Sequence, residues 1–202
     1  MTLGLGSWLA SAELVEPRID DLALSLAARA KAGDRLALRS IYDRYAPAVR
    51  RFVRDMLRDA PAADDALQDT FVRVFQRIAT LDEPERLAGW IFGIARRVCL
   101  EHRRHQTRRQ RTTELTPADF DAADSSATPE ALYSGSESAA ELDRAVDQLE
   151  PDRRAILLLR CDHQLSYDEI ATAMGFSLSK VKVELHRARL ALRAVFREME
   201  ER

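Results

Sequence analysis

Apolar residues recur every three or four positions along most of this chain, and that period limits the possible folds more than any other feature. The clearest stripes are Ile41, Tyr45, Val49 and Phe52, then Phe71, Val74, Phe75 and Ile78, then Trp90, Ile91, Ile94 and Val98. A helix that buries one face shows this period, whereas a half-buried strand alternates apolar and polar residues. Because no alternating segment is found, the sequence predicts an all-α fold.

The formal net charge of −2 hides an uneven distribution of charge. Residues 29–111 carry 19 basic and 11 acidic side chains, whereas residues 112–141 carry seven acidic and no basic ones. The second segment is rich in Ser, Thr, Ala, Asp and Pro, and such a composition buries too little surface to offset its ordering entropy. We therefore expect two small helical domains, 20–111 and 142–202, joined by a flexible acidic linker at 112–141.

The linker has two interpretations, a plain tether or an acidic strand that mimics nucleic acid in a basic channel of a partner. The leader at 1–19 lacks the positive and apolar regions of a signal peptide, so we do not interpret it as one and expect it to be disordered. No apolar run approaches the length of a membrane span. Two cysteines, Cys99 and Cys161, exclude a disulfide framework. Together these features favour a reduced cytoplasmic compartment.

Residues 166–190 have the form of a helix-turn-helix. Ser166 and Glu169 fit a capping box, Gly175 suits a left-handed turn, and Ser177 can cap the second helix or leave N–H groups for a phosphate. The outer face of that helix would carry Ser179, Lys180, Lys182, Val183, His186, Arg187 and Arg189. The pattern favours DNA binding, and the alternative is a helical hairpin with a solvated basic face.

Two further surfaces stand out in the first domain. Trp90 and Phe92 precede a run of arginines, and arginine beside aromatic rings suits a nucleic acid with unstacked bases. Alternatively, Trp90 belongs to the core. Asp64, Asp65 and Asp69 form a carboxylate-rich helix edge that could dock a basic protein surface. Alternatively, these residues reflect the ordinary preference of helix N-termini for acidic side chains.

Several of these segments, in this order, resemble bacterial sigma factors of the extracytoplasmic-function type, within the sigma-70 family. The segments are DDALQDTFVRVF, LAGWIFGIARRVCLEHRR and LEPDRRAILLLRCDHQLSYDEIATAMGFSLSKVKVELHRARLALR. The resemblance covers roughly residues 24–110 and 140–198. It implies a factor that binds core RNA polymerase, directs initiation at promoters and is held by an anti-sigma factor until a signal arrives.

The resemblance also implies roles for individual residues. Core polymerase would be bound by Asp64, Asp65, Gln68 and Asp69, with Phe71 and Val72 beneath them. The melted −10 element would be bound by Trp90, Arg96, Arg97, Arg103 and Arg104. The duplex −35 element would be bound by Ser177, Ser179, Lys180, Lys182, Val183, Glu184, His186, Arg187 and Arg189.

Departures from the family pattern prevent a promoter sequence from being carried over. Arg97 stands where Asn is frequent, Glu101 replaces Asp, and Gln164 replaces a frequent Gly. On the recognition helix Ser179-Lys180 replaces Gly-Thr, and Val183-Glu184 replaces Ser-Arg. An outward Glu184 could accept a hydrogen bond from cytosine or repel phosphate.

Other classes of protein are less well supported. Asp162, His163 and Ser166 lie close in sequence, but nothing orients them as a catalytic triad. Cys99, His102 and His105 would spread over about 120° of a helix, which is poor geometry for one metal ion. We therefore expect no enzyme activity, no cofactor and no metal. A helix-turn-helix regulator that acts without polymerase, or a decoy for an anti-sigma factor, remains the alternative.

Overall fold

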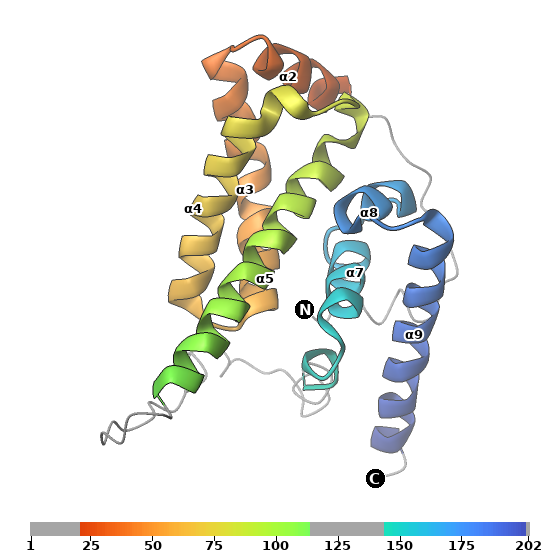
Figure 1. Ribbon diagram of the computed structural model, residues 1–202. Coiled ribbons are helices and arrows are strands. Elements are labelled where there is room, and N and C mark those ends of the chain that lie inside the picture. Colours follow the sequence, from red (N-terminus) through yellow and green to blue (C-terminus); the bar gives the residue numbers. More distant parts are fainter. Residues whose placement is uncertain (1–20, 114–143, 201–202) are drawn as a thin grey trace.

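The computed structural model describes residues 21–113 and 144–200, and every regular element in these ranges is a helix (Figure 1). The all-α fold predicted from the apolar period is therefore confirmed. The predicted leader at 1–19 and most of the predicted linker at 112–141 lie outside the described residues. No helix within the described ranges is long and apolar enough to cross a membrane.

The described N-terminal part consists of α-helices joined by short turns. The helices are α2 (Asp21–Lys31), α3 (Arg35–Leu57), α4 (Ala60–Arg77) and α5 (Leu87–Thr113). Two 3₁₀ turns, η1 (Ile78–Thr80) and η2 (Pro84–Arg86), separate α4 from α5. Helix α5 continues two residues beyond the domain end predicted at residue 111.

Side-chain caps explain where two of these helices begin. The Asp34 carboxylate accepts hydrogen bonds from the backbone N–H groups of Leu36 and Ala37, at 2.8 and 3.2 Å. Asp59 accepts one from the N–H of Ala62 at 3.0 Å. Each cap satisfies N–H groups that have no partner within the helix. The starts of α3 and α4 are therefore encoded locally.

The C-terminal part contains α7 (Pro151–Cys161), α8 (Tyr167–Met174) and α9 (Leu178–Glu200), after a helical turn at residues 144–147. The predicted capping box is confirmed: the N–H of Glu169 donates to Ser166 Oγ at 3.2 Å, and the N–H of Ser166 donates to the Glu169 carboxylate at 2.8 Å. Gly175 ends α8 with φ +66°. Helices α8 and α9 form the predicted helix-turn-helix.

The loop between α7 and α8 is held by a buried arginine. Arg160 donates to the carbonyl oxygen of Leu165 at 2.9 Å, and its guanidinium lies 4.8 Å from the centroid of the Tyr167 ring. Gln164 turns the chain with φ +53°, a conformation in which glycine has no steric cost. Gln164, which stands where the family often has glycine, therefore adopts the left-handed backbone conformation that favours glycine.

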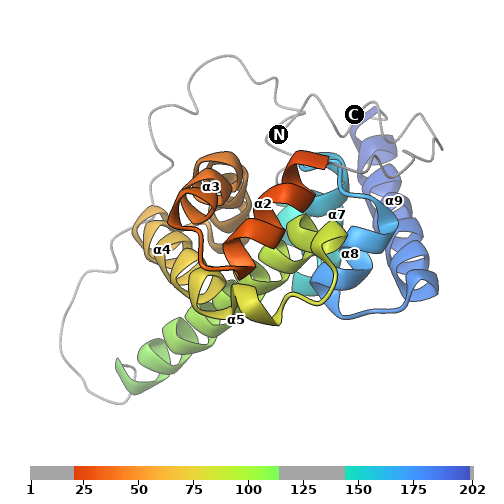
Figure 2. The same cartoon turned by 90° about the horizontal axis from the view of Figure 1, so that it is seen from above.

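Helix α5 lies between the N-terminal helices and α8, so the two predicted domains pack together (Figures 1 and 2). One continuous apolar core contains Phe52 and Ile91 from the first domain and Ile156 and Ile170 from the second, all fully buried. The linker signal predicted two domains, but the sequence analysis did not predict this shared core.

His163, in the loop after α7, lies in the contact between the two domains. Its ring centroid is 4.8 Å from that of Phe92 and 6.0 Å from that of Phe52. Neither ring nitrogen has a hydrogen-bond partner among the described residues. Burial, together with the nearby charge of Arg51, lowers the pKa of His163 to about 4. The packed contact thus requires a neutral imidazole.

We predict that His163 makes the stability of the chain depend on pH. Between the ordinary pKa of 6.5 and about 4, the unfolded chain binds a proton that the folded chain does not. The free energy of unfolding should therefore fall as pH falls, by at most about 1.4 kcal/mol per pH unit from this group. Urea unfolding of wild type and His163→Leu, at neutral pH and at a pH midway between the two pKa values, measures how the free energy of unfolding changes with pH. An equal pH slope in the two proteins would contradict the prediction.

Candidate functional site

The acidic edge of α4 is exposed on the outside of the N-terminal bundle. Asp64, Asp65, Gln68 and Asp69 are all exposed, whereas Phe71 is buried beneath them as predicted. Asp64 forms an ion pair with Arg50 of α3 at 2.8 Å. Val72 was expected beneath this edge as well, but it is 52% exposed and belongs to the surface. The helix rotation that places Asp65 and Asp69 outward carries residue 72 with them.

Two aromatic side chains that the sequence analysis did not single out as surface residues extend this edge. Tyr42 of α3 and Phe75 of α4 are 39% and 37% exposed, and both pack against Phe71, with ring centroids 4.7 and 6.0 Å apart. Together with Val72 they form an apolar strip beside the carboxylates. Apolar side chains clustered on a surface and rimmed by polar groups are typical of protein interaction sites.

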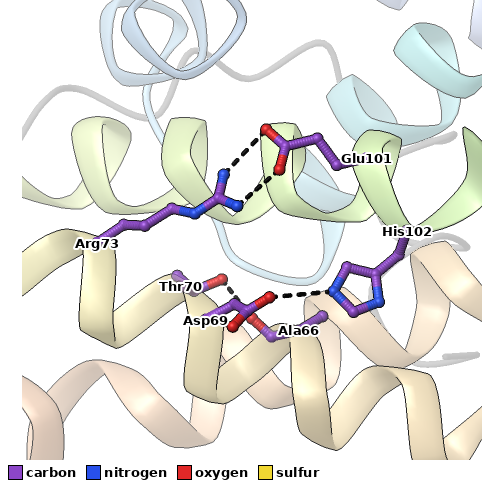
Figure 3. Close-up of polar contacts among 6 residues, drawn as sticks. All are labelled: Ala66, Asp69, Thr70, Arg73, Glu101 and His102. Atoms are coloured by element: carbon purple, nitrogen blue, oxygen red, sulfur yellow. Dashed lines mark hydrogen bonds and ion pairs between the residues drawn. The ribbon is translucent and has the colours of Figure 1, made fainter. Parts of the chain in front are cut away.

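One ion pair and one hydrogen bond join α4 to α5 (Figure 3). Arg73 donates to both carboxylate oxygens of Glu101, at 2.9 and 2.6 Å. This hydrogen bonding lowers the pKa of Glu101 and raises that of Arg73. Asp69 lies 3.3 Å from Nε2 of His102. A candidate polymerase residue is therefore held against the helix that carries the candidate −10 residues.

The arginines of α5 divide into two groups. Arg97, Arg103 and Arg104 are exposed. Arg96 has only 14% of its side chain exposed and forms an ion pair with Asp152 of α7. Trp90 is half-buried and packs against the core. It therefore contributes to the core and also leaves part of its surface accessible. The structure therefore does not gather the five candidate −10 residues on one open surface.

The recognition helix α9 presents most of its predicted residues to solvent. Exposed side chains are those of Ser177, Ser179, Lys180, Lys182, Val183, His186 and Arg187, and Arg189 is partly buried. Ser177 Oγ accepts from the N–H of Lys180 at 3.3 Å, which confirms the cap. The Lys180 ammonium lies 3.4 Å from the centroid of the Phe176 ring, a cation–π contact at the start of the helix.

Glu184 does not point outward, as one interpretation of the sequence required. Its side chain is 15% exposed and bonds Arg153 of α7 at 3.0 Å and Arg187 at 2.8 Å. Burial alone would raise the pKa of Glu184, but these two arginines outweigh it and lower the pKa. Arg187 lies one turn further along α9, whereas Arg153 reaches the carboxylate because α7 packs along α9, a contact that helix periodicity does not reveal. Glu184 therefore joins α9 to α7.

The side chains considered for catalysis or metal binding are buried or occupied by contacts within the fold. Among the described residues, no group of three His, Cys, Asp or Glu side chains could hold a metal ion. Cys99 and Cys161 are buried as free thiols, and burial raises the pKa of each to about 12. Ser166 is engaged in its capping box, and His163 faces aromatic rings.

Comparison with known proteins identifies the family. The family models for sigma-70 region 2 and sigma-70 region 4 match residues 41–109 and 139–192. The ECF RNA polymerase sigma factor SigX of Bacillus subtilis is 34% identical over 76% of this chain and 80% of its own length. SigL of Mycobacterium tuberculosis is 30% identical over 84% of this chain and 94% of its own. The chain belongs to the sigma-70 family, in its extracytoplasmic-function branch.

A solved structure supports the fold. CnrH, determined in complex with the cytosolic domain of CnrY, matches with a TM-score of 0.64 at 23% identity, over 88% of this chain and 99% of CnrH. This similarity extends over both helical parts described above.

We predict that Glu184→Gln changes stability and leaves DNA sequence preference unchanged. The amide keeps the shape but removes the charged acceptor of Arg153, so the free energy of unfolding should fall by about 1 kcal/mol. Denaturant unfolding measures the first effect, and selection from a random duplex pool measures the second. Val183→Ala, at the neighbouring exposed position, is the matched control, with altered preference and little change in stability. A changed preference in Glu184→Gln would make Glu184 a base-contacting residue.

Proposed function

We propose that this chain binds core RNA polymerase and directs initiation at promoters by recognising a −10 and a −35 element. The observation that carries the proposal is that both sigma-70 regions match in order, each on a helical unit with an exposed candidate surface. The relatives are themselves named RNA polymerase sigma factors. In this proposal the chain acts in the bacterial cytoplasm, catalyses no reaction itself and needs no cofactor.

The polymerase surface would be the outer edge of α4. Asp65, Gln68 and Asp69 would pair with basic groups of the polymerase, and the apolar strip of Tyr42, Val72 and Phe75 would be buried beside them. An interface with an apolar centre and a charged rim excludes water from its core, which concentrates the binding energy in few residues.

The −10 surface would be α5, where the promoter is bound as a melted strand. Exposed Arg97, Arg103 and Arg104 would bind phosphates, and Trp90 would contact an unstacked base. Stacking on an aromatic ring combined with basic side chains is the usual way to hold single-stranded DNA. An extruded base in a pocket offers contacts that a closed duplex does not present.

The −35 surface would be α9, docked in the major groove. Lys182, Arg187 and Arg189 would mainly position the helix on phosphates, which carry no sequence information. Ser179, Lys180, Val183 and His186 remain the candidates for contacts with base edges, with Ser177 near a phosphate at the helix start. Glu184 was such a candidate, and its ion pairs with Arg153 and Arg187 favour the proposal that it supports Arg187 instead.

An anti-sigma factor is the proposed regulator. One matched structure is that of the sigma factor RpoE with the anti-sigma factor NepR from Bartonella quintana, at 21% identity and a TM-score of 0.61. The acidic linker, most of which lies outside the described residues, would thread through polymerase as a tether or as a mimic of nucleic acid.

We predict that Asp65→Ala with Gln68→Ala weakens binding to sigma-free core polymerase by about tenfold or more, because a hydrogen bond between such a side chain and a charged group is worth about 1.5–3 kcal/mol. Both side chains are exposed, so helical content should not change. Co-elution with core polymerase measures the binding. Asp82→Ala removes an exposed carboxylate from the turn before α5 and serves as the control that retains binding. Unchanged binding by the double variant would contradict the assignment.

Lys182→Ala should weaken binding to duplex promoter DNA about equally for all sequences. A lysine that contacts one phosphate releases about one counterion, so the slope of log affinity against log salt should decrease by about one. A salt titration of the variant and wild type measures this slope. A change in sequence preference, with the slope unaltered, would instead make Lys182 a base-contacting residue.

A further inference from the structure

The turn between α8 and α9 fixes the backbone of Phe176. The N–H of Phe176 donates to the carbonyl oxygen of Ala171 at 3.1 Å. The N–H of Gly175 donates to that of Thr172 at 3.4 Å. Because Gly175 is left-handed, these two bonds form a Schellman motif, which ends α8 in one defined geometry. The Phe176 ring is partly buried and packs on the apolar core, so it has little freedom to move.

The backbone of Lys180, one turn further on, is fixed as well. Its N–H donates to Ser177 Oγ at 3.3 Å, and the N–H of Val181 donates to the carbonyl oxygen of Ser177 at 3.1 Å. The Lys180 ammonium lies 3.4 Å from the centroid of the Phe176 ring. A lysine side chain is flexible, but the quadrupole of an aromatic ring attracts a cation placed over its face. The ring thus holds the ammonium at one place at the start of α9.

The stability of α9 does not explain a lysine at this position. Lys180 is the third residue of the helix, and the first turn contains no acidic side chain. The helix dipole favours anions in the first turn and opposes a cation there. The carboxylate of Glu184, one turn further along, is engaged by Arg153 and Arg187. A ligand outside the chain therefore explains this exposed lysine better than a contact within the fold.

An ammonium that is held in place suits one base of the major groove. The first residues of a recognition helix lie nearest the base edges. An ammonium offers several N–H donors and no acceptor. Guanine presents two neighbouring acceptors, N7 and O6, whereas adenine presents an acceptor beside a donor, thymine an acceptor beside a methyl group, and cytosine a donor. A lysine that moves freely also finds phosphates, which carry no sequence information. Restraint by the ring therefore favours discrimination of guanine.

We propose that Phe176 is a positioning residue for recognition of the −35 element: its ring holds the Lys180 ammonium where it donates to the N7 and O6 atoms of a guanine. The inference rests on the proposed function of α9. Phe176 acts through Lys180 and makes no contact with a base itself. Lys180 then contributes sequence preference, in contrast to Lys182 on the same helix, which is assigned to phosphate.

Selection of promoter duplexes tests the proposal. The full chain is first bound to core polymerase, and the complex then selects duplexes from a pool that is randomised around the −35 position. Phe176→Leu keeps an apolar side chain on the core and removes the ring, whereas Phe176→Tyr keeps the ring and is the matched control. Lys180→Met keeps the length of the side chain and removes its charge. The double variant Phe176→Leu with Lys180→Met shows whether the two residues act as a unit.

A second measurement reports the contact between the ring and the ammonium without DNA. In the NMR spectrum of the free chain, the ring should shift the ε-methylene protons of Lys180 upfield, and this shift should vanish in Phe176→Leu. Replacement of Phe176 by pentafluorophenylalanine keeps the shape of the ring and removes the negative charge of its face. This replacement decides the selection experiment if Phe176→Leu loses helical content.

The wild-type complex should prefer guanine at one position of the −35 element. Lys180→Met should reduce this preference by about fivefold or more, because that is the discrimination of a well-placed contact to guanine. Phe176→Leu and the fluorinated chain should reduce it by about two- to fivefold, the value of an exposed cation–π contact, without changing the salt dependence of binding. Phe176→Tyr should match wild type, and the double variant should resemble Lys180→Met.

The inference is overturned if the guanine preference survives in both Phe176→Leu and the fluorinated chain. It is also overturned if the losses of the two single variants add in the double variant, or if the Lys180 protons of wild type show no upfield shift. Failure of wild type to bind polymerase, or a complex without any −35 preference, would refute the proposed function, and the inference would fall with it.

Discussion

The structure depends on the close contact between α5 and α8, in which two helix backbones meet at Gly89 and Gly93. Helix α5 packs on α3 and α4 with one face and on α8 with another, so a single helix belongs to the core of both parts. The same helix is joined to α4 through the ion pair of Arg73 with Glu101. Any partner that moves α8 therefore changes the surroundings of α5, the helix that carries the candidate −10 residues and packs against α4.

Charge is arranged along this scaffold in a way that the net value of −2 conceals. Exposed carboxylates gather on α4, and exposed arginines gather on α5, so one small bundle carries an acidic surface and a basic one. Ion pairs between elements take up a selected few of these charges, as with Arg96 and Asp152 or Glu184 and Arg153. Those paired residues support the fold, and the exposed residues beside them remain available for recognition.

Local features of the sequence predicted much of this structure. The capping box of Ser166, the cap at Ser177 and the turn at Gly175 all form as expected, because each depends on residues only a few positions apart. Contacts between distant segments were not predictable in this way. The ion pairs of Arg96 and Glu184, and the shared core itself, arise from packing of helices whose relative placement leaves no period in the sequence. The resemblance placed Val72 beneath the acidic edge with Phe71, but successive side chains on a helix point about 100° apart, and Val72 is exposed.

The central claim is that this chain gives core RNA polymerase its choice of promoter. The most direct test is transcription by sigma-free core polymerase on fragments of the source genome, with and without the chain, followed by mapping of the transcript starts. The account predicts starts that depend on the chain and share one −10 and one −35 sequence at constant spacing. Binding of the chain to polymerase without any new transcript start would contradict it.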